Sequence, residues 1–186
     1  MTPKEYLAMI FDGLKKSNIT TNVTKKIEWD DGFTTICGMF IQTRKEKRKL
    51  FLVGNGGSAA IAEHFLTDFL KNGGMRTVNI MSPALITCLS NDFCYANVYT
   101  KSLQILADED DLLVAISSSG NSSNIVHAIE TAKAMKMKVI TFSGFMANNH
   151  IRAMGDYNIY VPVEHYGIVE SIHNLLLQQI VDTIKL

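Results

Sequence analysis

Two short polar segments, each lying between an apolar run and a run of helix formers, hold the residues best suited to chemistry. The first, the glycine corner, spans 54–58, reads G-N-G-G-S and follows the apolar run 50–53. The second, the serine loop, spans 117–123 and contains five serines, a glycine and an asparagine. Backbone N–H groups and hydroxyls at the start of a helix can surround an anion without any lysine or arginine. Together the two segments predict a site for a phosphorylated, polyhydroxylated ligand.

Each segment also has a simpler interpretation. Tight strand-to-helix turns need glycine, and a serine before a helix can serve only as its N-cap. The glycine corner lacks the G-x-G-x-x-G spacing of dinucleotide sites and no Walker lysine follows it, so nucleotide binding is weakly supported. Two such segments at neighbouring corners favour a ligand site over a pair of plain turns.

The elements that must position these segments alternate from residue 49 onward, as is typical of a parallel sheet covered by helices. The predicted strands are 50–53, 77–81, 112–116, 139–142 and 157–161. The predicted helices are 58–71, 95–107, 122–136 and 165–185. The fold class is therefore α/β, a doubly wound five-stranded parallel sheet. Such sheets bind ligands at the carboxyl ends of their strands, where both polar segments are expected.

The first 48 residues do not follow this alternation and predict an N-terminal helical arm (1–48) ahead of the α/β domain (49–186). A helix is expected over 3–17, a connection over 17–26, and then a second helix capped by Asp30 or Asp31. The apolar stripe of this second helix consists of Phe33, Ile36, Cys37, Phe40 and Ile41. We expect the arm to pack against another subunit, because an exposed apolar helix usually needs a partner.

The composition narrows the class of protein. The 186 residues are 47% apolar and carry a formal net charge of zero, which argues against nucleic-acid and membrane-surface partners. No apolar run approaches the ~20 residues of a membrane span. The three cysteines match neither a disulfide framework nor a zinc cluster, and reduced thiols in the cytoplasm fit best.

Three motifs in combination resemble the sugar isomerase (SIS) domain, and within it the phosphoheptose isomerase branch. They are G-N-G-G-S-A-A with H-F over 54–65, N-D-F over 91–93, and I-S-S-S-G-N-S over 116–122. The resemblance implies an enzyme that interconverts sedoheptulose 7-phosphate and D-glycero-D-manno-heptose 7-phosphate through a cis-enediol. It also implies a homotetramer with active sites at subunit interfaces.

The resemblance also assigns residues to the binding of the sugar phosphate. The phosphate would be held by Ser117, Ser118, Ser119 and Ser122. The sugar would be lined by Asn55, Gly56, Gly57 and Ser58, with Asn91, Asp92 and Glu170 beside it.

The family binds zinc, and this chain departs from the family pattern at the zinc ligands. The corresponding residues are His64, Asp68, Glu170 and Gln178, where the family has histidine, glutamate, glutamine and histidine. His64 and Asp68 are four residues apart and so share a helical face. Asp68 takes the place of the usual catalytic base, with Glu170 as the competing carboxylate. The acid would be His173, a water or a metal-bound group.

These departures leave two other functions open. One is a non-catalytic binder of phosphosugars that resembles the DnaA initiator-associating protein, which has altered metal-site residues. The other is an isomerase of a different phosphosugar, with the same phosphate site and a different pocket wall.

Overall fold

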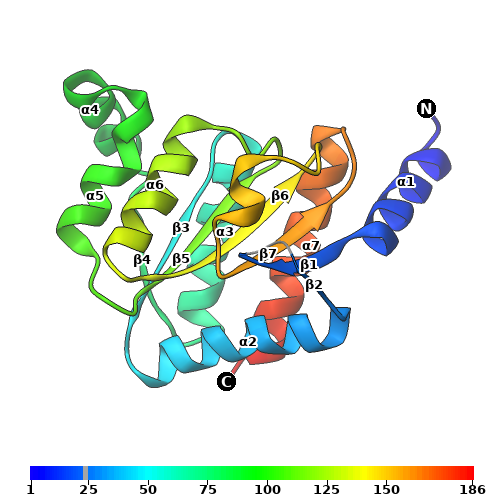
Figure 1. Cartoon of the computed structure of the whole chain (residues 1–186), viewed down its shortest axis with the longest axis horizontal. Coiled ribbons are helices and arrows are strands. Elements are labelled where there is room, and N and C mark those ends of the chain that lie inside the picture. The colour runs from blue at the N-terminus through cyan, green and yellow to red at the C-terminus, as the bar shows by residue number, and fades with distance from the viewer. Residues whose placement is uncertain (23–24) are drawn as a thin grey trace.

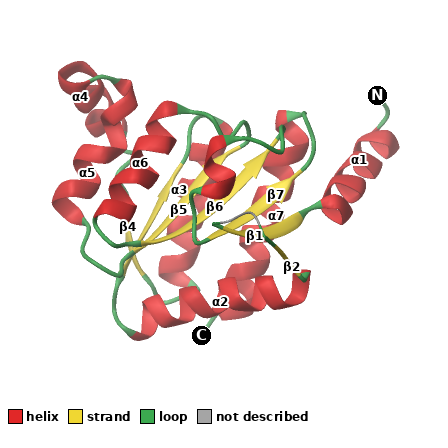
Figure 2. Cartoon of the chain, in the orientation of Figure 1, coloured by secondary structure: helices red, strands yellow, loops and turns green. Residues whose placement is uncertain are grey.

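A seven-stranded sheet runs through the protein and carries helices on both faces (Figure 1). The computed structural model describes residues 1–22 and 25–186. The strand order is β2-β1-β7-β6-β5-β3-β4. Helices α2, α3 and α7 cover one face, and α5 and α6 cover the other (Figure 1). Figure 2 shows how strands and helices alternate along the chain.

Five neighbouring strands of the sheet, in the order β7-β6-β5-β3-β4, are parallel, which confirms the predicted core of the fold. They are β3 (Lys49–Val53), β4 (Arg76–Val78), β5 (Leu112–Ser117), β6 (Lys138–Gly144) and β7 (Tyr157–Val161). Every residue of β5 is buried, as expected for a central strand covered on both faces. β3 and β5 are neighbours in the sheet, so the glycine corner and the serine loop leave it side by side.

An antiparallel hairpin extends the sheet beyond β7, and this corrects the connection predicted over 17–26. The hairpin consists of β1 (Asn18–Thr21) and β2 (Lys26–Ile27), and β1 pairs with β7. Residues 23–24 of that prediction lie outside the described residues. The pairing partner of β1 is distant in sequence, and fully buried Ile19 is its main apolar anchor. A short segment rich in threonine and asparagine gives no local sign of such a pairing.

The helices begin and end close to the predicted positions, with one exception. They are α1 (Pro3–Lys16), α2 (Trp29–Lys45), α3 (Gly57–Lys71), α4 (Pro83–Phe93), α5 (Val98–Leu106), α6 (Ser123–Ala134) and α7 (Tyr166–Ile184). Short 3-10 helices lie at η1 (Tyr95–Asn97) and η2 (His150–Ala153). Helix α4 is the exception and was not predicted, although Ser82 caps it and Pro83 begins it. All residues of α4 are described and none is fully buried, although Leu85, Ile86 and Leu89 are partly buried against the core.

Helix α2 packs within its own chain. Its cap is Glu28, whose side chain accepts a hydrogen bond from the N–H of Asp30, rather than Asp30 or Asp31 as predicted. Phe40 is fully buried and stacks on Phe69 of α3 with ring centroids 4.7 Å apart. The predicted stripe is buried except for Ile41, which is 42% exposed.

Helix α1 projects from the body of the molecule and packs against α7 (Figure 1). Gly13 makes this packing close, because a Cβ atom there would lie 2.8 Å from Ile172 of α7. Leu7 and Phe11 of α1 are more than half exposed. Within the described residues, no helix combines the length and the apolar character that crossing a membrane requires.

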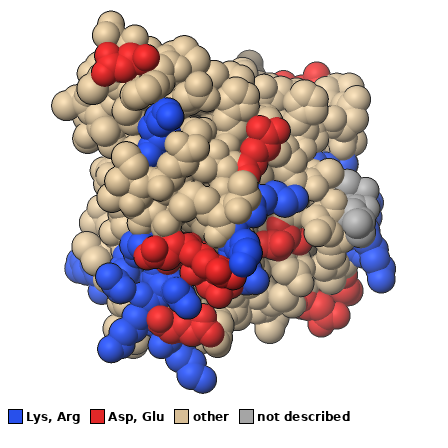
Figure 3. Space-filling view, turned by 60° about the vertical axis from the view of Figure 1, so that its left-hand side comes forward, with Lys and Arg blue, Asp and Glu red and all other residues tan. Residues whose placement is uncertain are grey.

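Charged side chains of both signs gather at one end of the molecule, in the lower part of Figure 3. At the amino ends of the parallel strands β3 and β5, Lys49 Nζ lies 2.5 Å from Asp108 Oδ2 and 3.2 Å from Asp111 Oδ2. The opposite, carboxyl edge of the sheet is where a ligand site is expected.

Candidate active site

The glycine corner and the serine loop are joined by a pair of side-chain amides. Asn55 Nδ2 donates to Asn124 Oδ1 over 2.9 Å, and Asn124 Nδ2 donates back to Asn55 Oδ1 over 2.8 Å. Asn55 follows β3, and Asn124 lies in the first turn of α6, directly after the serine loop. The structure thus brings together the two segments that the sequence analysis expected to converge.

The glycine corner opens α3 in a conformation that depends on its glycines. Gly56 has a φ of +53°, in the left-handed region that side chains disfavour. At Gly57, a Cβ atom would lie 2.5 Å from Oε2 of Glu170, so glycine is required for that carboxylate to approach. The absence of a side chain therefore lets α7 place a carboxylate against the start of α3.

The serine loop folds back on itself at the start of α6. The N–H of Gly120 donates to Ser117 Oγ over 3.1 Å, and the N–H of Asn121 donates to Ser119 Oγ over 3.4 Å. Ser118 Oγ is buried and has no hydrogen-bond partner among the described residues. Ser122 occupies the N-cap of α6, and its hydroxyl makes no capping bond to this fully described helix. The loop therefore presents hydroxyls at the positive end of a helix, where an anion is favoured.

Two tyrosines that the sequence analysis missed complete the wall beside the glycine corner. Tyr95 Oη donates to Asn55 Oδ1 over 2.9 Å, and Tyr99 Oη donates to the carbonyl of Gly54 over 2.5 Å. Burial raises the pKa of Tyr99 above its usual range, so this hydroxyl remains a donor. Both tyrosines line a pocket of about 260 Å³ together with Asn55 and Glu63.

Glu170 lies in the second turn of α7, against Gly57 of the glycine corner. It lines a pocket of about 460 Å³ with Tyr6, Gly57 and Asn174. Burial raises the pKa of the Glu170 carboxyl, because the charged form loses hydration there. A carboxyl whose pKa is raised toward neutrality is suited to take and return a proton.

Helix α7 also reaches the serine loop. A Cβ atom at Gly144, the last residue of β6, would lie 2.7 Å from Val169 and 3.0 Å from the carbonyl oxygen of Ser118. Three elements therefore meet at this edge of the sheet, namely the serine loop, the start of α3 and the start of α7. Ser58, the last residue of the glycine corner, is buried in this region.

Asn91 and Asp92 lie elsewhere than the loop position that the sequence analysis gave them. Both are in the last turn of α4, where Asn91 Nδ2 donates to Asp92 Oδ1 over 3.0 Å. Their side chains do not line the pockets beside Asn55 or Glu170. Within one chain, the structure does not bring these two residues to the glycine corner.

The residues predicted to hold zinc are only partly brought together. His64 Nε2 lies 3.3 Å from Asp68 Oδ2, as their spacing on one helical face predicts. Glu170 lies instead against Gly57, about 10 Å along α3 from His64 at 1.5 Å per residue. Within residues 1–22 and 25–186, no three histidine, cysteine, aspartate or glutamate side chains lie together so as to hold a metal ion. Gln178 lines a separate surface pocket on α7. As placed in this chain, the set does not fit a zinc ion.

His173 lies in the interior beneath the end of β6. Its side chain is fully buried, and Nε2 donates to the carbonyl of Ser143 over 3.2 Å. Burial lowers the pKa of His173 to about 4, although the hydrogen bond to Ser143 opposes this shift. The ring is therefore neutral near pH 7 and is enclosed by the core, away from either pocket.

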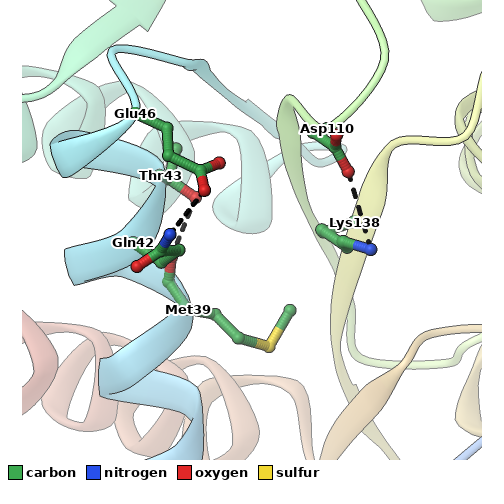
Figure 4. A pocket seen from close by; sticks show the side chains of 6 residues that line it. All are labelled: Met39, Gln42, Thr43, Glu46, Asp110 and Lys138. Atoms are coloured by element: carbon green, nitrogen blue, oxygen red, sulfur yellow. Dashed lines mark hydrogen bonds and ion pairs between the residues drawn. The ribbon is translucent and has the colours of Figure 1, made fainter.

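A further hollow of about 230 Å³ lies at the opposite edge of the sheet, between α2 and the start of β6 (Figure 4). Gln42 bonds to Glu46 across its wall, and Lys138 Nζ lies 3.6 Å from Asp110 Oδ1. These polar groups are paired with one another, so the hollow offers weaker ligand chemistry than the carboxyl edge.

The fold and the two converging segments define a class of protein, the SIS domain of sugar-phosphate-binding α/β proteins. The family model for the SIS domain matches residues 17–144. The phosphoheptose isomerase of Buchnera aphidicola (subspecies Acyrthosiphon pisum) is 36% identical over 142 residues, which are 74% of this chain and 72% of that protein. The chain belongs to the phosphoheptose isomerase family.

Other relatives agree with this assignment. The phosphoheptose isomerase of Helicobacter pylori is 28% identical over 153 residues, 79% of each chain. The structure of phosphoheptose isomerase from Neisseria gonorrhoeae superposes with a TM-score of 0.82 at 26% identity, and covers 97% of this chain and 93% of that one. The Francisella tularensis enzyme has a TM-score of 0.83 at 22% identity over 99% and 98% of the two chains, which supports the fold.

Proposed function

We propose that this chain interconverts sedoheptulose 7-phosphate and D-glycero-D-manno-heptose 7-phosphate through a cis-enediol. The observation that carries the proposal is the reciprocal amide pair between Asn55 and Asn124, which ties the glycine corner to the serine loop. A sugar phosphate has an anionic end, which suits the serine loop, and a chain of hydroxyls, which suits the glycine corner. The names of the relatives support the same substrate class.

In this proposal the serine loop holds the phosphate. Ser118 Oγ is the strongest single donor, because it is buried and lacks a partner among the described residues. Ser122 adds a hydroxyl at the N-cap of α6, and Ser117 and Ser119 shape the loop through their bonds to backbone N–H groups. The positive end of α6 offsets the phosphate charge.

Glu170 acts as the base that removes the proton from the carbon next to the carbonyl. Its carboxylate lies against Gly57 in a pocket of about 460 Å³, and burial raises its pKa, which makes it a stronger base than an exposed carboxylate. Asp68 lies about 16 Å further along α3 at 1.5 Å per residue, and it is paired with His64. Distance and pairing therefore both favour Glu170 over Asp68.

The same carboxyl can carry the carbon-bound proton in both halves of the reaction. In a cis-enediol the two reacting carbons are adjacent and share one face, so the proton that Glu170 takes from one carbon can be returned to the other. As the old carbonyl oxygen gains a proton and the neighbouring hydroxyl loses one to become the new carbonyl, water carries this second proton between the two oxygens. His173 is enclosed in the core and takes no part in this step. No step passes through zinc, because the predicted ligands are not assembled in this chain.

We further propose that the protein is a homotetramer in the cytoplasm. Leu7 and Phe11 form an exposed apolar pair on α1, which is a surface suited to a second copy of the chain. Cys37, Cys88 and Cys94 are all unpaired thiols, which fits a reducing compartment.

The test is incubation of the purified protein with sedoheptulose 7-phosphate, with and without a chelator, followed by proton NMR. The proposal expects the aldose phosphate to appear at similar rates in both samples. Binding measured by calorimetry without any interconversion would contradict it and indicate a non-catalytic binder. Turnover of a different phosphosugar alone would contradict the assigned substrate.

A further inference from the structure

The carboxamide of Asn55 is held by three hydrogen bonds. Its Oδ1 accepts from Asn124 Nδ2 over 2.8 Å and from Tyr95 Oη over 2.9 Å, which occupies both lone pairs. Its Nδ2 donates one N–H to Asn124 Oδ1 over 2.9 Å. The second N–H has no partner among the described residues. Asn55 can therefore offer a ligand one donor in a fixed direction, and no acceptor.

Asn124 differs from Asn55 in its access to ligand. It is 1% exposed, and both polar atoms of its carboxamide bond to Asn55, whereas Ser118 Oγ has no partner among the described residues. Asn55 is partly exposed and lines the pocket of about 260 Å³ beside the glycine corner. Asn124 can thus influence a ligand only through Asn55. Because Asn124 belongs to the first turn of α6, it also fixes Asn55 relative to the serine loop.

We propose that Asn124, assisted by Tyr95, is a positioning residue that makes Asn55 present a single N–H to an oxygen of the bound sugar. This inference rests on the proposed isomerase function. When a base removes the proton next to a carbonyl, negative charge develops on the carbonyl oxygen, and a preorganised donor stabilises it. Loss of the amide pair would let the Asn55 carboxamide rotate and misplace that donor.

The proposal predicts that loss of the Asn124 side chain lowers kcat and leaves KM nearly unchanged. Asn124→Ala should lower kcat by about 10- to 100-fold, the range expected when a catalytic group is misplaced by an ångström or so. KM should change less than threefold, because the serine loop still holds the phosphate. A role confined to stability would lower the melting temperature and leave the kcat of the folded enzyme unchanged.

A double-mutant cycle with Asn55→Ala separates positioning from a general structural effect. If Asn124 acts through Asn55, Asn124→Ala should lower kcat in the wild-type background and change it less than twofold in the Asn55→Ala background. The matched control is Asn97→Ala, since Asn97 bonds to His127 and to the backbone of Phe93 but not to the glycine corner. The control should keep kcat within twofold.

Tyr95→Phe provides a second cycle that does not depend on a buried substitution. Tyr95 is 50% exposed, so the variant should fold, and it removes only the bond to Asn55 Oδ1. We expect a fall in kcat that disappears in the Asn55→Ala background. Unchanged kcat, or equal losses in both backgrounds, in either cycle would overturn the proposal. If Asn124→Ala does not fold, the Tyr95 cycle decides alone.

Wild-type turnover of sedoheptulose 7-phosphate is measured first. This measurement tests the proposed isomerase function separately from the positioning role of Asn124. Absence of wild-type turnover would contradict the proposed function. The same cycles would then be measured as binding affinity for this sugar phosphate. Coupling between Asn124 and Asn55 in affinity would still support the positioning role, and simple additivity would overturn it.

Discussion

The buried His173 should make the protein less stable as the pH falls from neutral to about 4. Burial lowers the pKa of this ring to about 4 from its usual value of 6.5. Below pH 6.5 the unfolded chain binds a proton at this position, while the native chain does not. The native state therefore loses free energy of unfolding relative to neutral pH, and the loss levels off near the folded pKa.

The size of the effect follows from the two pKa values. A shift from 6.5 to about 4 corresponds to about 3 kcal/mol at roughly 1.4 kcal/mol per pKa unit. Nearly all of this contribution to the free energy of unfolding should be lost between pH 7 and pH 4. Carboxylates elsewhere in the chain also titrate in this range, so the contribution of His173 must be taken as a difference between two proteins.

The assay is urea unfolding of wild type and His173→Phe at several pH values and one fixed protein concentration. Phenylalanine keeps the aromatic volume beside Phe142, whose ring centroid is 5.5 Å from that of His173, and it cannot be protonated. At pH 7 the variant should be less stable, because the carbonyl of Ser143 loses its donor. Between pH 7 and pH 4 the gap should narrow by about 3 kcal/mol. A gap that stays constant with pH would refute the assignment of a buried, neutral histidine.

Four further predictions concern the site. Glu170→Gln should lower kcat by roughly 10²- to 10⁴-fold, the usual contribution of an acid–base group, while Asp68→Asn should keep most of the rate; the opposite order would contradict the choice of base. In steady-state assays, kcat/KM should fall as pH falls through the raised pKa of Glu170, because only the carboxylate can accept a proton. Gly57→Ala should lower kcat with no loss of helix content by circular dichroism, because the added methyl displaces the Glu170 carboxylate although alanine favours helix. Ser118→Ala should raise KM by at least about tenfold with little effect on kcat, as expected for a lost hydrogen bond to a charged group.

The features that the sequence predicted well have signals within a few neighbouring residues. Apolar runs between helix formers mark the five parallel strands, and the glycine corner and serine loop are contiguous segments. Because the two segments follow adjacent strands of a parallel sheet, topology brings them together. The i, i+4 spacing of His64 and Asp68 likewise predicted a pair that the structure contains.

The features that were missed depend on contacts between distant residues. Strand β1 is recognisable only through its pairing with β7, more than a hundred residues later. Asn124 and Tyr95 are ordinary polar residues until the fold places their side chains on Asn55. One signal was available for α4, since a serine followed by proline is a common helix start, and it was passed over. His173 is polar in sequence, and only packing shows that it is enclosed.

The central claim is that the glycine corner and the serine loop hold one sugar phosphate between them. The most direct measurement is a crystal structure of the protein with sedoheptulose 7-phosphate. The phosphate should lie within hydrogen-bond distance of Ser118 Oγ, with the sugar hydroxyls against Asn55 and the reacting carbons facing Glu170. A phosphate bound at any other surface, with the serine loop empty, would contradict the claim.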